Sequence, residues 1–182
     1  MPDEPSGVKV GERVEPFRLL RGHQDFVSAA DLVAEGTALL HFWPFAYTGS
    51  RDKGQGCEAQ VCGFGDRHEE FAALGVRLVG VSHDSPFVLS RWHDELEQPY
   101  EFLSDYNWEA AKAFGILVEE AFDCYRPLNT RAAFLIDQDR IVRHAQVTAM
   151  TVLPSADEAL AAARELVNNT PGYNPDPAKG AS

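Results

Sequence analysis

The chain has 182 residues, a length typical of one domain with modest extensions and able to bury a core without disulfide bonds. Its 16 basic and 28 acidic residues give a net charge of −12, which repels phosphate backbones and anionic lipids. We therefore expect no nucleic-acid or membrane partner. No run approaches the roughly 20 apolar residues of a membrane helix, and the polar N-terminus lacks the apolar core of a secretory signal. These features favour a cytoplasmic protein.

The first third of the chain indicates a buried strand that follows short peripheral elements. Residues 38–43 form a continuous apolar run ended by Pro44, which is typical of a central strand covered on both faces. A glycine-rich loop with alternating charges follows over residues 45–56. The segments before the strand are predicted as a flexible terminus at 1–7, a short β-hairpin across 8–20 and a short helix or turn at 27–34.

Helices and strands alternate along the rest of the chain. Apolar spacings of three and four and capping residues predict helices at 57–74, 85–97, 107–114 and 155–167. Short apolar runs predict strands at 76–82, 102–103, 132–137 and 141–145. Prolines and glycines predict a disordered tail at 168–182. This order predicts one α/β domain over residues 8–167, with a mixed central sheet flanked by helices.

Cys57 stands where the glycine-rich loop meets the start of a predicted helix. Unpaired backbone N–H groups and the helix dipole at that position stabilise a thiolate, which is the nucleophilic form of cysteine. Three cysteines are too few for a disulfide framework, and a reducing compartment favours catalytic or redox-sensing thiols over structural ones. Spacing alone also allows Cys57 to be a small buried side chain without reactivity.

Cys62 follows five residues later on the same predicted helix, about 140° around its axis. The two sulfurs cannot bond while that helix is intact, so any Cys57–Cys62 disulfide requires its first turn to unwind. By spacing alone, Cys62 is also explained as a core residue. A zinc site with His68 is disfavoured, because structural zinc sites use a second ligand pair. We expect no metal and no cofactor.

Three motifs resemble the peroxiredoxin (alkyl hydroperoxide reductase/thiol-specific antioxidant) family, and they occur in the order in which the family carries them. They are residues 42–49 with 57–64, residues 79–87 and residues 130–137. The resemblance covers roughly residues 8–165 and implies a thioredoxin-like fold with thiol peroxidase chemistry.

The resemblance also implies roles for individual residues. Cys57 corresponds to the peroxidatic cysteine, and Cys62 to the resolving cysteine of bacterioferritin-comigratory-type members. Pro44 and Thr48 match the proline and threonine of the family's P-x-x-x-T-x-x-C loop. Arg131 matches the arginine that supports the thiolate and polarises the peroxide, a task suited to a permanently charged fork of donors.

The sequence departs from the family pattern at two positions. Cys57 follows Thr48 by nine residues instead of three, so six extra residues lie within residues 49–56. This loop either bulges outward and restores the geometry, or separates Thr48 from Cys57. The second departure is Gln60, where many members with a nearby resolving cysteine carry glutamate.

Three further residues are candidates for a role in catalysis or in the core. Cys124 could resolve Cys57 or bridge a dimer, although a neutral surface thiol is the preferred interpretation. His83 could act as an acid or base near neutral pH, against the simpler interpretation of a solvated loop histidine. His41, inside the apolar strand, is predicted to be a core residue with its hydrogen bonds satisfied.

Three functions fit these patterns. The leading one is a thiol peroxidase for hydrogen or organic peroxides, recycled by a thioredoxin-like protein or a low-molecular-weight thiol and acting as a monomer or homodimer. The second is an enzyme of the same fold, a thiol-dependent reductase or tailoring enzyme, with a larger organic substrate beneath the inserted loop. The third is a non-enzymatic redox sensor with a Cys57–Cys62 switch.

Overall fold

The computed structural model describes residues 5–125 and 127–170. Its strands are β1 (Arg18–Gly22), β2 (Asp25–Ser28), β3 (Thr37–Phe42), β4 (Val76–Ser82), β5 (Glu101–Ser104), β6 (Leu117–Val118), β7 (Leu128–Asn129), β8 (Arg131–Ile136) and β9 (Val142–Thr148). Its helices are α1 (Ala29–Leu32), α2 (Gly56–Gly65), α3 (His68–Ala73), α4 (Pro86–Leu96), α5 (Glu109–Ala113) and α6 (Ala156–Asn169).

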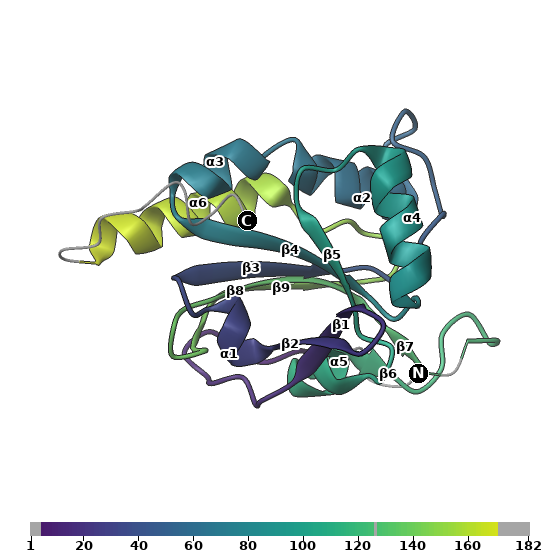
Figure 1. Ribbon diagram of the computed structural model, residues 1–182, viewed down its shortest axis with the longest axis horizontal. Helices are drawn as coiled ribbons and strands as arrows, with labels where there is room; N and C mark the ends of the chain where they lie inside the picture. The colour runs from purple at the N-terminus through teal and green to yellow at the C-terminus, as the bar shows by residue number, and fades with distance from the viewer. Residues whose placement is uncertain (1–4, 126, 171–182) are drawn as a thin grey trace.

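The described residues build a mixed seven-stranded sheet in the order β2-β1-β5-β4-β3-β8-β9, with β6 and β7 paired separately. β3 lies near the middle, parallel to β4 and antiparallel to β8, and all six of its residues are buried. Helices α2, α3, α4 and α6 cover one face, and α1 and α5 cover the other (Figure 1). The α/β fold with helices on both faces of a mixed sheet is therefore confirmed.

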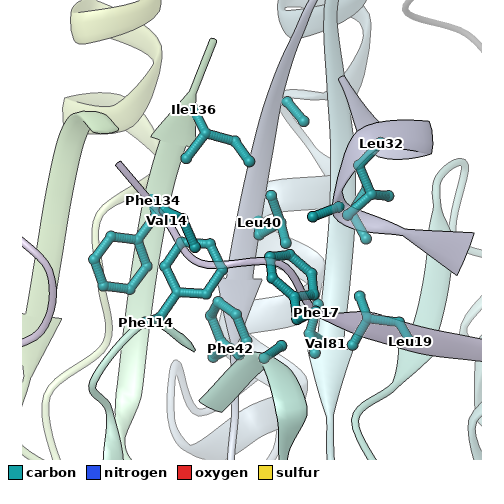
Figure 2. Packing of buried hydrophobic residues seen from close by; sticks show 14 of the residues in the cluster. Val14, Phe17, Leu19, Leu32, Leu40, Phe42, Val81, Phe114, Phe134 and Ile136 are labelled. Atoms are coloured by element: carbon teal, nitrogen blue, oxygen red, sulfur yellow. The ribbon is translucent and has the colours of Figure 1, made fainter. Parts of the chain in front are cut away.

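Two apolar cores fill the spaces on either side of the sheet, because side chains along a strand alternate between its faces. Leu40 and Phe42 of β3 belong to the core that includes α1 and α5. Figure 2 shows the aromatic rings of this core, Phe17, Phe42, Phe114 and Phe134. Leu39 and Trp43 point to the opposite core, which also contains Cys57. The reactive cysteine predicted from the sequence thus lies on the α2 face of the sheet.

The hairpin predicted across residues 8–20 is wrong. The chain before β1 is irregular, with an isolated bridge between Arg13 and Ile141, and the N-terminal hairpin is formed by β1 and β2 instead. Val14 and Phe17 are almost fully buried and pack into the core. The alternating apolar residues of this segment therefore fill the core, although the segment does not form a strand.

The single helix predicted over residues 57–74 is two helices, α2 and α3. The break follows Gly65, where the N–H of Arg67 bonds the carbonyl of Phe64 in a tight turn. Glycine weakens a helix interior by about 1 kcal/mol relative to alanine, and both Gly63 and Gly65 lie in this part of α2. The cysteine-bearing helix is therefore short, with glycine at two of its last three positions.

The ends of the chain extend beyond the predicted domain limits. α6 continues to Asn169, two residues past the expected boundary. At the other end Gly7, one residue before the predicted domain, is packed so closely that a Cβ on it would lie 2.6 Å from Val147. The flexible terminus and the disordered tail otherwise fall on residues 1–4 and 171–182, outside the described part. No helix among the described residues is long and apolar enough to cross a membrane.

Gly80, in the middle of β4, lies in a tightly packed part of the core that contains Cys57, and a substitution there tests this packing. A methyl group there would lie 2.7 Å from the Trp43 ring and 3.1 Å from Phe102. Gly80→Ala is expected to destabilise the fold by ~1–3 kcal/mol, measured by urea unfolding, because overpacking a tight core forces side chains apart. The matched control is Gly63→Ala in α2, where a methyl group meets nothing within 4 Å. It should stabilise the protein by about 0.5–1 kcal/mol. Equal effects of the two substitutions would contradict this account.

Candidate active site

Cys57 lies in the first turn of α2 and faces Arg131 at the beginning of β8. The Nη2 of Arg131 is 3.4 Å from the sulfur of Cys57, within hydrogen-bonding range for sulfur. Both side chains are buried, with 1% of Cys57 and 5% of Arg131 exposed. A guanidinium at this distance places a positive charge and a hydrogen-bond donor beside the sulfur.

Two hydrogen bonds fix the guanidinium of Arg131 beside that sulfur. Its Nε donates to the carbonyl of Met150 at 2.6 Å, and its Nη1 donates to Oε1 of Gln60 at 2.7 Å. The amide nitrogen of Gln60 in turn donates to the carbonyl of Phe42 at 2.9 Å, which fixes the orientation of the amide. Gln60 therefore joins Arg131 to the central strand, three residues along α2 from Cys57.

His41 extends this hydrogen-bond network across the core. The Tyr100 hydroxyl donates to the Val61 carbonyl at 2.9 Å, so it accepts from Nε2 of His41, also at 2.9 Å. The Nδ1 of His41 then accepts from the amide of Gln60 at 3.3 Å. Burial lowers the pKa of His41 to about 3, and its ring stacks on Phe64. The histidine is thus neutral, and its role as a satisfied core residue is confirmed.

The loop that follows β3 is held against the end of β4. Pro44 is buried, and the N–H of Ala46 donates to a carboxylate oxygen of Asp84 at 2.7 Å. The Ser82 hydroxyl donates to the same oxygen at 2.6 Å. Asp84 is therefore an anchor of the loop, a role that sequence reasoning missed although the residue lies inside a motif quoted above.

Thr48 remains adjacent to the start of α2. Its carbonyl accepts from the N–H of Glu58, the residue after Cys57, at 3.0 Å. Its hydroxyl donates to the carbonyl of Phe45 at 3.0 Å, which closes a turn within the loop. The backbone of Thr48 is thus joined to the helix that carries Cys57, although nine residues separate the two in sequence.

The six extra residues form a small hairpin that leaves the loop and returns to the same point. Ser50 and Gln55 pair through two backbone hydrogen bonds of 2.8 and 3.2 Å. At the base, Gly49 and Gly56 approach so closely that a Cβ on Gly56 would lie 2.3 Å from the Cα of Gly49. Both have positive φ, so glycine suits them on two counts. Of the two alternatives, the structure therefore shows the bulge: residues 50–55 project outward beside α2 (Figure 1).

Cys62 lies on the same helix as Cys57, and it too is buried and forms no disulfide. Burial raises the pKa of its thiol, and the Gln98 amide lies 3.8 Å from its sulfur. Because residues 57 and 62 both fall within the intact α2, a disulfide between them requires the helix to open.

The remaining candidates lie around this centre. His83 stacks on Trp108 and contacts the ring of Phe45, and burial lowers its pKa. It is therefore a packed, half-buried residue instead of a solvated one. Cys124 is exposed in the loop between β6 and β7. Within the described residues no group of three or more histidine, cysteine or acidic side chains could hold a metal ion.

The sheet, the cysteine at a helix start and the buried arginine beside it define a thioredoxin-like thiol oxidoreductase. The AhpC/TSA family model matches residues 10–145, so the chain belongs to that family. It is 30% identical over 139 residues to peroxiredoxin Bcp of Escherichia coli, covering 75% of this chain and 84% of that one.

Solved structures share this fold. Peroxidoxin BcpB from Mycobacterium tuberculosis has a TM-score of 0.71 and 29% identity, over 87% of this chain and 97% of that one. Reduced Prx3 from Vibrio vulnificus is similar in fold, with a TM-score of 0.73 and 23% identity over 86% of this chain and 99% of that one. The protein is thus a peroxiredoxin, a thiol-dependent peroxidase, which supports the first of the three functions considered.

Acid is expected to destabilise the fold through His41. An unfolded histidine takes up a proton near its usual pKa of 6.5, whereas burial keeps folded His41 neutral until about pH 3. Its contribution to stability is therefore complete above pH 6.5 and is lost as the pH falls toward 3. The loss is at most about 1.4 kcal/mol per pH unit. Urea unfolding at descending pH should give a shallower decline for His41→Gln than for wild type; equal slopes would contradict the assignment.

Proposed function

We propose that Cys57 is the peroxidatic cysteine and that Arg131 activates both the sulfur and the peroxide. The observation that carries the proposal is the 3.4 Å contact between Arg131 Nη2 and Cys57 Sγ inside a buried site. The Cys57 thiolate attacks one peroxide oxygen, so that an S–O bond forms while the O–O bond breaks. Arg131 stabilises the negative charge that develops on the oxygens, and the leaving oxygen takes a proton to depart as water or an alcohol.

Thr48 and Pro44 complete the proposed peroxide site. The paired hairpin returns Gly56 to Gly49, so the loop runs from Thr48 through two adjacent glycines to Cys57. This path has the residue spacing of the family's P-x-x-x-T-x-x-C loop. The Thr48 hydroxyl, which donates to the Phe45 carbonyl, can accept a hydrogen bond from the peroxide. Pro44, which is buried, excludes water from the thiolate.

We assign the resolving role to Cys62. Its thiolate attacks the sulfur of the Cys57 sulfenic acid, the S–O bond breaks, and the hydroxide that leaves takes a proton to become water. The two cysteines share α2, so this step follows local opening of that helix. A thioredoxin-like protein or a low-molecular-weight thiol then reduces the disulfide by thiol exchange.

The substrate class follows from the burial of the sulfur. With 1% of Cys57 exposed, hydrogen peroxide and small organic peroxides fit the site better than bulky ones. All three cysteines are free, which agrees with a reducing compartment such as the cytoplasm. We propose that the enzyme acts there as a monomer or homodimer.

Replacing each cysteine separates the two roles. Cys57→Ser is expected to abolish peroxide consumption in a thioredoxin-coupled assay, because no other thiol faces Arg131 in the described structure. Cys62→Ser should complete one turnover and accumulate a sulfenic acid that dimedone traps. Cys124→Ser is the control and should turn over like wild type. Full activity of Cys57→Ser would refute the nucleophile, and a Cys57–Cys124 bond in the oxidised protein would transfer the resolving role.

Deleting residues 50–55 tests whether the insertion is compatible with peroxide chemistry. The deletion joins Gly49 to Gly56, which already lie in contact, so the loop can close with little rearrangement. We expect sulfenic acid to form on Cys57 at nearly the wild-type rate in a single turnover with hydrogen peroxide. A large loss of that rate in a protein with unchanged circular dichroism would show that the hairpin is part of the peroxide site.

A further inference from the structure

The inserted hairpin places a cation across the helix face that carries Cys62. Glu58, Cys62 and Asp66 are spaced by four residues, so they line one face along α2 and its C-terminal end. The backbone N–H of Arg51 donates to the Glu58 carboxylate at 2.9 Å. The guanidinium of Arg51 binds both carboxylate oxygens of Asp66, at 2.8 and 3.1 Å. Arg51 thus contacts both ends of this row, with Cys62 between them.

The charges of this row act on the Cys62 thiol in opposite directions. Burial raises the pKa of Cys62 most, and the carboxylates of Glu58 and Asp66 raise it further. The positive charge of Arg51 lowers it. Tyr100, which packs nearby from the core side, has a pKa raised well above its usual range and stays neutral. Arg51 is therefore the positive charge that acts on this sulfur, and the Gln98 amide, 3.8 Å from it, is a neutral donor.

We propose that Arg51 is a positioning residue for the resolving step: held by Glu58 and Asp66, it lies across the helix face that carries Cys62 and prepares that thiol before α2 opens. The inference rests on the proposed function, in which the Cys62 thiolate attacks the Cys57 sulfenic acid. An S–S bond then forms, the S–O bond breaks, and the departing hydroxide takes a proton to leave as water. Arg51 is one of the six extra residues. The inserted hairpin therefore provides the positive charge that acts on Cys62 in the resolving step.

The test follows disulfide formation after one equivalent of hydrogen peroxide, as a function of pH. Arg51→Met is expected to move the midpoint of the rate profile to higher pH and to slow disulfide formation several-fold at neutral pH, because fewer thiols are ionised. Arg51→Lys keeps the charge and should restore the midpoint. Asp66→Asn removes an opposing carboxylate and should move the midpoint to lower pH. The matched control is Lys53→Met, which removes an exposed charge from the same hairpin and should leave the profile unchanged.

A second readout isolates Cys62 from the reaction. In a Cys57→Ser, Cys124→Ser background Cys62 is the only thiol, and its ultraviolet thiolate absorbance should titrate at higher pH when Arg51→Met is added. If wild type forms no Cys57–Cys62 disulfide, the proposed function of Cys62 fails. If the disulfide forms but Arg51→Met leaves both midpoints unchanged, or changes the rate equally at all pH values, Arg51 only holds the helix and this inference alone is overturned.

Discussion

The buried charge of Arg131 is the constraint on which the rest of the site depends. A guanidinium removed from water requires hydrogen-bond acceptors and a counter-ion, or the fold loses several kcal/mol. Two of its three recorded partners are neutral, the Gln60 amide and the Met150 carbonyl. The third is Cys57, which can ionise. With glutamine in place of the glutamate common among related proteins, the cysteine is the partner that can supply the missing negative charge. In the proposed mechanism the same contact compensates the charge of the arginine and activates the thiolate.

Helix α2, which carries both cysteines, has few stabilising features of its own and depends on contacts with the core. Gln55, its N-cap, makes no side-chain capping bond, and glycines occupy positions 63 and 65. Tyr100 compensates from the core by donating to the carbonyl of Val61, between the two cysteines in sequence. Such a helix has little stability of its own and is ordered by its packing against the core. That balance suits a cycle in which the sulfurs must first be separated and then bonded.

The inserted hairpin shows how a loop can lengthen without disturbing an active site. Closure entropy rises slowly with loop length, so six residues add little cost when they pair with themselves. Two glycines with positive φ allow the backbones at the hairpin base to approach more closely than any other residue permits. The Thr48 carbonyl consequently accepts from the N–H of Glu58 across the base of the insertion. The projecting residues are then free to acquire contacts of their own, as Arg51 has with Asp66.

The sequence by itself determined the α/β fold and most of its elements, because buried strands and helix starts leave local patterns. The start of a helix also points to Cys57, whereas Arg131 is predicted through the family resemblance alone. It erred where glycines divided α2 from α3 and where Val14 and Phe17 mimicked a strand, since tertiary packing overrides local periodicity. Only the tertiary structure decided whether the insertion bulges outward and which residues surround each sulfur. Those outcomes depend on contacts between residues distant in sequence, such as Gln60 with Arg131, and on the close approach of Gly49 to Gly56, which no local pattern encodes.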